Sequence, residues 1–256
     1  MDREEAGSMD TYQPETYGQR IAEVYDDWYD VVDESTVPVL AELGRGGRAL
    51  ELGIGTGRVA IPLQRAGVSV EGIDASESMV ARMRQKPGGS EIPVTIGDMA
   101  EVAVEGEYAL VYVLFNTFFS LLTQEDQVRC FRNVARHLGP GGSFVLECFV
   151  PDPARLAARQ GVRASEVGED ALRLEAAQIN LAKQLITSQT VLLTEEGLKL
   201  YPVKIRYVWP SELDLMAQLA GLALCHRWSS WRKDPFTASS KEHVSVYGWA
   251  QPEGAT

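Results

Sequence analysis

Residues 49–60, ALELGIGTGRVA, combine an apolar run with three closely spaced glycines, Gly53, Gly55 and Gly57. Glycine accepts positive φ values and has no Cβ, so a ligand can lie directly against the backbone of such a loop. One carboxylate, Glu51, interrupts the apolar run two residues before the first glycine. The pattern predicts a strand that turns into a helix and holds a ligand at the turn; a tight turn without a ligand is the alternative.

Two details of the loop indicate which ligand it holds. Dinucleotide-binding loops have the register G-x-G-x-x-G, with the pyrophosphate at the N-terminus of the following helix. Here the third glycine comes one residue early, and Arg58 stands where that register has glycine. The charge of Glu51 would repel a pyrophosphate but suits the amino and sulfonium groups of S-adenosylmethionine. The loop therefore favours S-adenosylmethionine over a dinucleotide.

The elements that position this loop alternate between strands and helices. Five apolar runs bounded by Gly or Asp predict strands at 46–55, 68–76, 92–99, 108–116 and 143–151. Segments with helical spacing lie before and between these runs, at 21–30, 35–44, 57–67, 76–86 and 123–142. This alternation is typical of a parallel sheet that is covered by helices on both faces.

The pattern changes after Pro151. Three alternating segments predict successive antiparallel strands at 171–180, 184–195 and 198–209, and a helix and two final strands follow at 210–222, 223–231 and 243–250. We therefore expect an N-terminal helical cap, a cofactor-binding core interrupted once, and an antiparallel β insert that forms a lid over the active site. Their expected bounds are 1–45 for the cap, 46–164 and 210–256 for the core, and 165–209 for the insert.

Composition excludes several classes of function. A formal net charge of −12 argues against a nucleic-acid partner, because phosphate binding needs an excess of Lys and Arg. No segment approaches the roughly 20 apolar residues of a membrane span, and the start, MDREEAG, is unlike a signal peptide. Cys130, Cys148 and Cys225 lie in apolar runs without metal or disulfide spacing, so we expect buried, reduced thiols in a cytoplasmic protein. The sequence leaves the oligomeric state open.

Several motifs in order, LELGIGTGR, VEGIDASESMV, IGDM, LVYVLFNTFFSL and HLGPGGSFVLECFVP, resemble those of class I S-adenosylmethionine-dependent methyltransferases. The resemblance covers about residues 49–151. A weaker resemblance, through AEVYDDWYD upstream and WPSEL and DPFT downstream, is to bacterial natural-product methyltransferases, including N-methyltransferases of nucleotide-linked amino sugars. It implies an α/β, Rossmann-like fold with a seven-stranded, mostly parallel sheet, and S-adenosyl-L-methionine as the cofactor.

The resemblance also implies cofactor-binding residues at the positions that match the family's motifs. Asp74, at the end of the second predicted strand, matches the acid that accepts both ribose hydroxyls, which suits a carboxylate; capping of the helix beside Ser76 is its other open role. Asp98 matches the acid that accepts the adenine amino proton. The implied set is Tyr17, Tyr29, Glu51, Gly53, Gly55, Gly57, Asp74, Ala75, Met79, Gly97, Asp98, Met99, Leu114, Phe115 and Asn116.

The acceptor is expected at the carboxyl ends of the parallel strands, where ligands of open α/β sheets bind. Glu147, near the end of the fifth strand, is a candidate base or amine anchor, with a solvated rim carboxylate as the alternative. We also expect His243 to face the pocket from the last strand, since histidine titrates near neutrality. His137 lies at the opposite edge of the sheet, and His226 is expected to be buried and structural. The expected substrate-binding residues are Phe149, Trp209, Trp231 and Arg232.

The implied reaction is direct transfer of the sulfonium methyl group to N or O of a small-molecule acceptor, such as a natural-product or sugar intermediate. Such a transfer needs alignment of the reactants and exclusion of water, and no metal. Three alternatives remain: a nicotinamide-dependent oxidoreductase, although no Tyr/Lys pair follows the fourth strand; a non-catalytic S-adenosylmethionine-binding regulatory module; and a protein or peptide methyltransferase.

Overall fold

The structure is a computed structural model that describes residues 12–29, 31–101 and 103–250. These residues form a seven-stranded sheet, in the order β10-β11-β5-β4-β1-β2-β3, and a four-stranded sheet, in the order β6-β7-β8-β9. Strands β1 to β5 are parallel, and β11 runs antiparallel to both β5 and β10. The four-stranded sheet is antiparallel throughout. The predicted fold class is confirmed.

The elements have the following bounds. The seven-stranded sheet contains β1 Ala49–Leu52, β2 Val70–Asp74, β3 Val94–Ile96, β4 Tyr108–Val113, β5 Leu138–Phe149, β10 Leu222–Trp228 and β11 Glu242–Trp249. The four-stranded sheet contains β6 Gln160–Val167, β7 Ala171–Asn180, β8 Leu185–Thr194 and β9 Gly197–Arg206. The helices are α1 Thr16–Ile21, α2 Tyr25–Trp28, α3 Thr36–Gly44, α4 Ala60–Arg65, α5 Glu77–Arg84, η2 Gly89–Glu91, η3 Thr117–Ser120, α6 Gln124–His137, α7 Pro153–Ala158 and α8 Pro210–Leu219.

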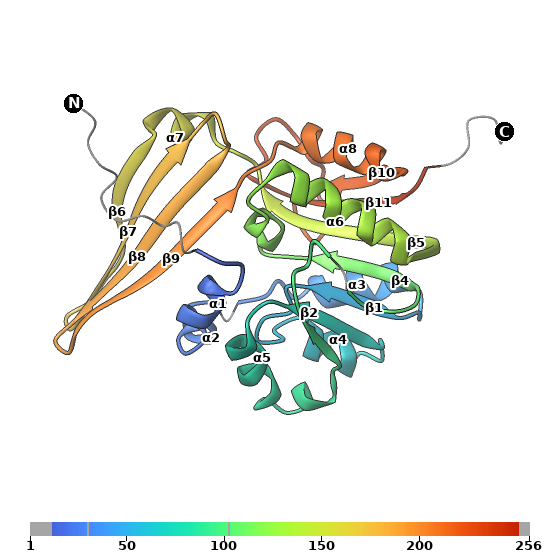
Figure 1. Ribbon diagram of the computed structural model, residues 1–256, viewed down its shortest axis with the longest axis horizontal. Coiled ribbons are helices and arrows are strands. Elements are labelled where there is room, and N and C mark those ends of the chain that lie inside the picture. The colour runs from blue at the N-terminus through green and yellow to red at the C-terminus, as the bar shows by residue number, and fades with distance from the viewer. Residues whose placement is uncertain (1–11, 30, 102, 251–256) are drawn as a thin grey trace.

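Helices cover both faces of the seven-stranded sheet (Figure 1). On one face, α6 and α8 bury Phe131 and Leu213 in a core that includes Leu50 of β1. On the other face, α3 and α4 bury Leu40 and Leu63 in a second core. Because side chains alternate along a strand, the central strands are apolar on both faces, which explains their nearly continuous hydrophobic runs.

The four-stranded sheet begins earlier than the insert expected from the sequence, at Gln160 rather than at residue 165. Its first strand, β6, was not predicted. All eight residues of β6 are exposed, so this edge strand has none of the buried, alternating apolar positions by which strands are recognised. The other three strands correspond to the three predicted ones.

The N-terminal region divides into two parts. Helices α1 and α2 lie beside β9 of the four-stranded sheet (Figure 1), and Ile21 of α1 and Trp28 of α2 pack with Tyr201. Helix α3 instead packs against β4, β5 and α4 and is therefore part of the sheet's core. The expected cap at 1–45 thus contains two kinds of structure, and its first 11 residues lie outside the described ranges.

Two expectations about buried residues are wrong. Cys130 and Cys148 are buried, but Cys225 is exposed. His226 is also exposed and stacks on Trp228, because both residues lie on β10, at the edge of the sheet. Among the described residues, no helix has the length and apolar character needed to cross a membrane.

Candidate active site

A cavity of about 770 Å³ lies where the carboxyl ends of the parallel strands meet α1, α2 and the four-stranded sheet. Fourteen of the residues singled out from the sequence line it: Tyr17, Tyr29, Gly53, Gly55, Asp74, Ala75, Met79, Gly97, Asp98, Met99, Phe115, Asn116, Glu147 and Phe149. The structure therefore brings together residues from six separate segments of the sequence at the carboxyl ends of the parallel strands, where ligands of open α/β sheets bind.

The glycine loop forms one wall of this cavity. Gly53 and Gly55 have φ values of 71° and 57°, which residues with a Cβ rarely adopt. A Cβ on Gly53 would lie 2.4 Å from the side chain of Thr117, so the loop also depends on the missing side chain for its packing. The backbone of the loop is thus exposed to the cavity, as binding of a ligand against it requires.

Asp74 links the glycine loop to the start of α5. Its Oδ2 accepts a hydrogen bond from Gly55 N at 2.7 Å, and its Oδ1 accepts one from Ser76 N at 2.8 Å. The side chain of Ser76, rather than that of Asp74, caps α5 by accepting from Met79 N. Burial raises the pKa of Asp74, and the two backbone donors oppose this effect. A carboxylate oxygen has a second lone pair, so Asp74 retains the capacity to accept hydroxyl donors.

Another part of the cavity wall suits a flat, partly polar ring. Gly97 lines it, and a Cβ there would meet nothing within 4 Å, so this residue borders open space. Asp98 supplies a carboxylate beside it, and Met79 and Met99 supply polarizable apolar surface. Together with the glycine loop and Asp74, this donor and acceptor set fits the adenosyl and methionyl parts of S-adenosylmethionine.

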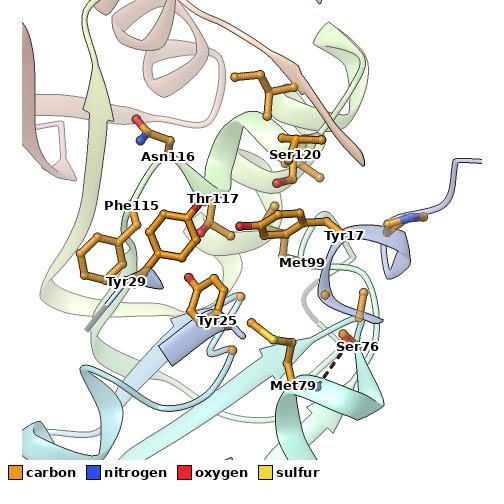
Figure 2. Close-up of a pocket in the computed structure, with 18 of the residues that line it drawn as sticks. Tyr17, Tyr25, Tyr29, Ser76, Met79, Met99, Phe115, Asn116, Thr117 and Ser120 are labelled. Carbon is orange, nitrogen blue, oxygen red and sulfur yellow. Dashed lines mark hydrogen bonds between the residues drawn. The ribbon is translucent and has the colours of Figure 1, made fainter. Parts of the chain in front are cut away.

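Three tyrosines from the N-terminal helices cover the cavity. Figure 2 shows Tyr17, Tyr25 and Tyr29 gathered around its centre, near Phe115 and Thr117. The ring centroids of Tyr25 and Tyr29 are 5.2 Å apart, and those of Tyr17 and Tyr25 are 6.4 Å apart. Burial raises the pKa of Tyr17 well above its ordinary value, so this phenol stays protonated at neutral pH.

Arg58 links this aromatic cover to the glycine loop, a role that was not predicted from the sequence. Its guanidinium lies 4.2 Å from the ring centroid of Phe115 and 4.8 Å from that of Tyr25. It also donates hydrogen bonds to the Tyr25 hydroxyl, at 2.9 Å, and to the Tyr29 carbonyl. Only the position of Arg58, directly after the glycines, could have indicated this role.

Phe115 and Asn116, which follow β4, have an unusual backbone conformation, with φ values of 54° and 66°. Non-glycine residues in the left-handed region cost free energy and are held in place by their surroundings. Here Asn116 Oδ1 accepts from Phe149 N at 2.6 Å, and Asn116 N donates to the Glu147 carbonyl at 3.1 Å. These bonds join the ends of β4 and β5 at the cavity.

Glu147 lies at this junction. Its carboxylate accepts hydrogen bonds from Phe115 N at 3.0 Å and from the indole N–H of Trp231 at 2.9 Å. Burial raises the pKa of Glu147, while both donors lower it. Glu147 is therefore a fixed carboxyl group that lines the cavity and binds a proton more readily than an exposed glutamate does.

The inner face of the four-stranded sheet forms the wall opposite the parallel strands. It contributes Glu175, Ile186, Ser188, Thr190, Val203 and Ile205. Glu175 accepts from Arg155 at 3.2 Å and from Arg163 at 2.8 Å. These residues were not predicted from the sequence. The side of each strand that faces the cavity depends on the pairing register and on how the sheet docks against the rest of the chain.

Glu51 does not line the cavity, contrary to expectation. It is buried below the loop, where its Oε2 accepts a hydrogen bond from the Tyr112 hydroxyl at 3.0 Å. Burial raises the pKa of Glu51 to about 8. At neutral pH it is largely protonated, so the argument that its negative charge suits a cationic ligand does not apply to this structure.

Gly57 and Leu114 also lie away from the cavity. Gly57 has a positive φ of 73°, and a Cβ there would lie 2.6 Å from Met83, so it allows the turn to pack against α5. Leu114 is buried in the core between the sheet and α3. Neither is among the residues that line the cavity.

His243 faces the wrong side of the sheet for a base. It is completely buried, and its Nδ1 lies 2.8 Å from Ser245 Oγ. Burial lowers the pKa of His243 to about 4. Val244 of β11 lies directly opposite Glu147 of β5, so these two side chains share a face of the sheet. The side chain of the neighbouring residue, His243, lies on the other face.

Three of the four expected substrate-binding residues lie elsewhere. Trp231 is buried and reaches the site only through its hydrogen bond to Glu147. Trp209 lines a separate hollow with Arg227 and Phe236. Arg232 is exposed in the loop before β11. Phe149 alone of these four lines the cavity.

Comparisons with known proteins agree with this architecture. Residues 49–142 match the family model described as a methyltransferase domain. The CcbJ methyltransferase from Streptomyces caelestis has a similar structure, with 38% identity, a TM-score of 0.87, and coverage of 94% of this chain and 100% of that chain.

Two curated relatives are also similar. The cypemycin N-terminal methyltransferase of a Streptomyces species is 29% identical over 78% of this chain and 82% of its own length. A dTDP-4-amino-2,3,4,6-tetradeoxy-D-glucose N,N-dimethyltransferase from Saccharopolyspora spinosa is 29% identical over 51% of this chain and 55% of its own length. With this fold and this similarity, the chain belongs to the class I S-adenosylmethionine-dependent methyltransferases.

Proposed function

We propose that the chain methylates an amine nitrogen of a small acceptor related to natural-product or sugar intermediates. The observation that carries the proposal is the charge of the cavity. Its described lining includes six carboxyl groups and two arginines, and one of these arginines, Arg155, is paired with Glu175. The carboxyl groups belong to Asp74, Asp98, Asp126, Glu147, Glu175 and Glu242. Such a lining attracts a protonated amine more than a neutral hydroxyl.

The cofactor would be held by the residues that fit it. In this proposal the backbone of the glycine loop lies along the methionyl part, Asp74 accepts the ribose hydroxyls, and Asp98 accepts the adenine amino group. Tyr17 and Tyr29 cover the bound cofactor. S-adenosylmethionine, when bound, supplies a methyl group on a positively charged sulfur that an acceptor nitrogen can displace directly.

Glu147 is the group that we propose to act on the acceptor. An ammonium nitrogen has no lone pair, so it must lose a proton before it can attack. Burial raises the pKa of Glu147, which favours its role as the proton acceptor. The apolar side chains of Ile186, Val203 and Ile205 on the inner face of the four-stranded sheet, with the tyrosines that cover the cavity, exclude water while the acceptor is aligned.

The names of two relatives support nitrogen as the acceptor atom. The cypemycin enzyme is named for an N-terminal amine and the Saccharopolyspora enzyme for the amine of a sugar. A peptide α-amine is therefore the second candidate acceptor, beside the amine of a small sugar or ring.

Matched acceptors test the proposal. The protein is incubated with S-adenosylmethionine and pairs of compounds that differ only at one group: an aminodeoxy sugar and its hydroxy parent, and a short peptide and its N-acetylated form. Mass spectrometry is expected to find methylation of the amine member of a pair and none of its partner. Methylation of a hydroxyl while the matched amine stays unmodified would contradict the proposal. Methylation of the peptide alone would favour the second candidate.

A further inference from the structure

One side of the four-stranded sheet is turned away from the cavity. On this side, three successive rows of residues that run across all four strands contain no charged side chain. Residues directly opposite one another in neighbouring strands share a face, so the register defines these rows. They are Val167, Leu172, Leu193 and Leu198; Ala164, Leu174, Val191 and Leu200; and Val162, Ala176, Gln189 and Pro202. We call these residues the outer face. Gln189 is its one polar member.

Most charged residues of the same strands lie on the inner face, and the two exceptions, Lys204 and Arg206, lie near the end of β9 beyond the three rows of the outer face. The rows that alternate with the outer face place Arg163 opposite Glu175 and Glu166 opposite Arg173, with Lys199 in the same row as Arg173. Glu175 lines the cavity, which fixes this side as the inner one. A sheet with only its inner face packed would have its charged residues on the outside. This sheet has the reverse distribution.

The outer face is open to solvent among the described residues. None of its residues is buried, and Val162, Val167 and Leu198 are 71%, 76% and 56% exposed. The sheet projects from the rest of the molecule, with β6 farthest from the seven-stranded sheet (Figure 1). Helices α1 and η3 contact the sheet at β9. The contacts of α2 and α7 are on the inner face, where Trp28 lies against Arg173 and Arg155 pairs with Glu175. An apolar patch of this kind on a soluble chain indicates an interaction surface.

We propose that two copies of this chain pack together through their outer faces, sheet against sheet, about a two-fold axis. Each chain carries a net charge of −12, so most surfaces of two copies repel each other. The outer face lets copies meet without opposing like charges. An isologous contact needs a self-complementary surface, and an uncharged, nearly flat sheet face meets this condition. Aligned sheets pack in this way in β-sandwiches.

The outer face can supply the apolar centre of such an interface, about half of the area that each chain would bury. Four strands about 4.8 Å apart and three rows about 6.7 Å apart cover roughly 400 Å². Interfaces of stable complexes bury about 800 Å² on each partner, as an apolar centre within a polar rim. The next row of the outward side is polar and supplies part of such a rim: Gln160, Gln178, Thr187 and Lys204.

Sedimentation velocity over a range of concentrations tests the proposal with a matched pair of variants. Val162→Glu/Leu198→Glu places two charges on the outer face. Leu215→Glu/Leu219→Glu adds the same charges on α8, where both leucines are 60% exposed. Circular dichroism and thermal unfolding check that both variants are folded; all four side chains are exposed, so the fold does not depend on them.

The wild type and the α8 variant are expected to sediment as dimers of the 28.1 kDa chain. The outer-face variant is expected to be monomeric, with a dissociation constant at least about 100-fold higher, because each dimer would bury four added carboxylates. A wild type that is monomeric throughout would overturn the proposal, as the face would then serve another partner or be covered by the chain's own residues. A dimer that survives the outer-face substitutions, or that both variants lose equally, would also overturn it.

Discussion

The carboxylate of Glu147, near the end of β5, accepts a hydrogen bond from the backbone N–H of Phe115, just after β4, at 3.0 Å. The contact depends on the left-handed conformation of Phe115, whose φ is 54°. It joins the proposed proton acceptor to the segment that also borders the cofactor's place in the cavity. A glutamine at this position has one amide oxygen, which can keep one of the two hydrogen bonds that Glu147 accepts, from Phe115 N or from the indole N–H of Trp231, but it cannot take up the proton.

Glu147→Gln is expected to lower kcat/KM for an amine acceptor by about 100-fold and to change its pH profile. Burial raises the pKa of Glu147, and only the ionised form can take a proton. The activity of the wild type should therefore rise with pH through a value above the usual range of a glutamate. The variant should lack this rise. Glu242→Gln, at another carboxylate that lines the cavity, is the control and should keep it. An unchanged profile in Glu147→Gln would show that Glu147 is not the base.

Glu51→Gln is expected to stabilise the protein at alkaline pH. The pKa of Glu51 is about 8 in the folded chain and about 4.5 for an ordinary glutamate, so between these values the folded state holds a proton that the unfolded state has lost. The unfolding free energy of the wild type should therefore fall as pH rises through this window, by up to about 1.4 kcal/mol per pH unit.

In Glu51→Gln this contribution is absent, while the amide oxygen still accepts from the Tyr112 hydroxyl. At pH 8 the variant should be more stable than the wild type by a few kcal/mol. Urea denaturation at pH 6, 7 and 8 measures both effects, with the exposed Glu91→Gln as the control. Equal slopes in Glu51→Gln and the wild type would mean that Glu51 is ionised in the folded chain.

Arg58→Lys is expected to weaken binding of S-adenosylhomocysteine by about 10-fold. Lysine keeps the charge but cannot stack a flat group on Phe115 and Tyr25 while donating to the Tyr29 carbonyl. The cover formed by α1 and α2 should then be held less firmly. Arg65→Lys, which affects a bond to the Pro87 carbonyl at the surface, is the matched control. Titration calorimetry measures the affinity of the three proteins for S-adenosylhomocysteine. Equal affinities would show that Arg58 does not contribute to binding of this ligand.

The parts of the fold that follow from burial could be predicted from the sequence. The central strands of the seven-stranded sheet, such as β1 and β4, bury both faces and so appear as apolar runs. Ser76 and Thr123 cap α5 and α6 with side chains that favour this position. Strand β6 could not be found in this way, because it is held by pairing with β7 and has no buried side chains.

Residues of the candidate site could be predicted from the sequence where their position depends only on the local turn or strand end that contains them. Gly53, Gly55 and Asp74 follow directly from the turn between β1 and α4 and from the end of β2. His243 was misplaced because one residue of offset along β11 reverses the face on which a side chain lies. Glu175 was missed because its position depends on how the four-stranded sheet docks over the cavity, which no local pattern records.

The most direct test of the account is calorimetric titration with S-adenosylhomocysteine and, separately, with NAD. The wild type is expected to bind S-adenosylhomocysteine with a dissociation constant on the order of micromolar, and not to bind NAD. Asp74→Asn should weaken binding by about 100-fold, because it loses charged hydrogen bonds to the ribose. Asp126→Asn, at another carboxylate that lines the cavity, should bind like the wild type. Binding of NAD in place of S-adenosylhomocysteine, or full affinity in Asp74→Asn, would contradict the assignment of this cavity as the cofactor site.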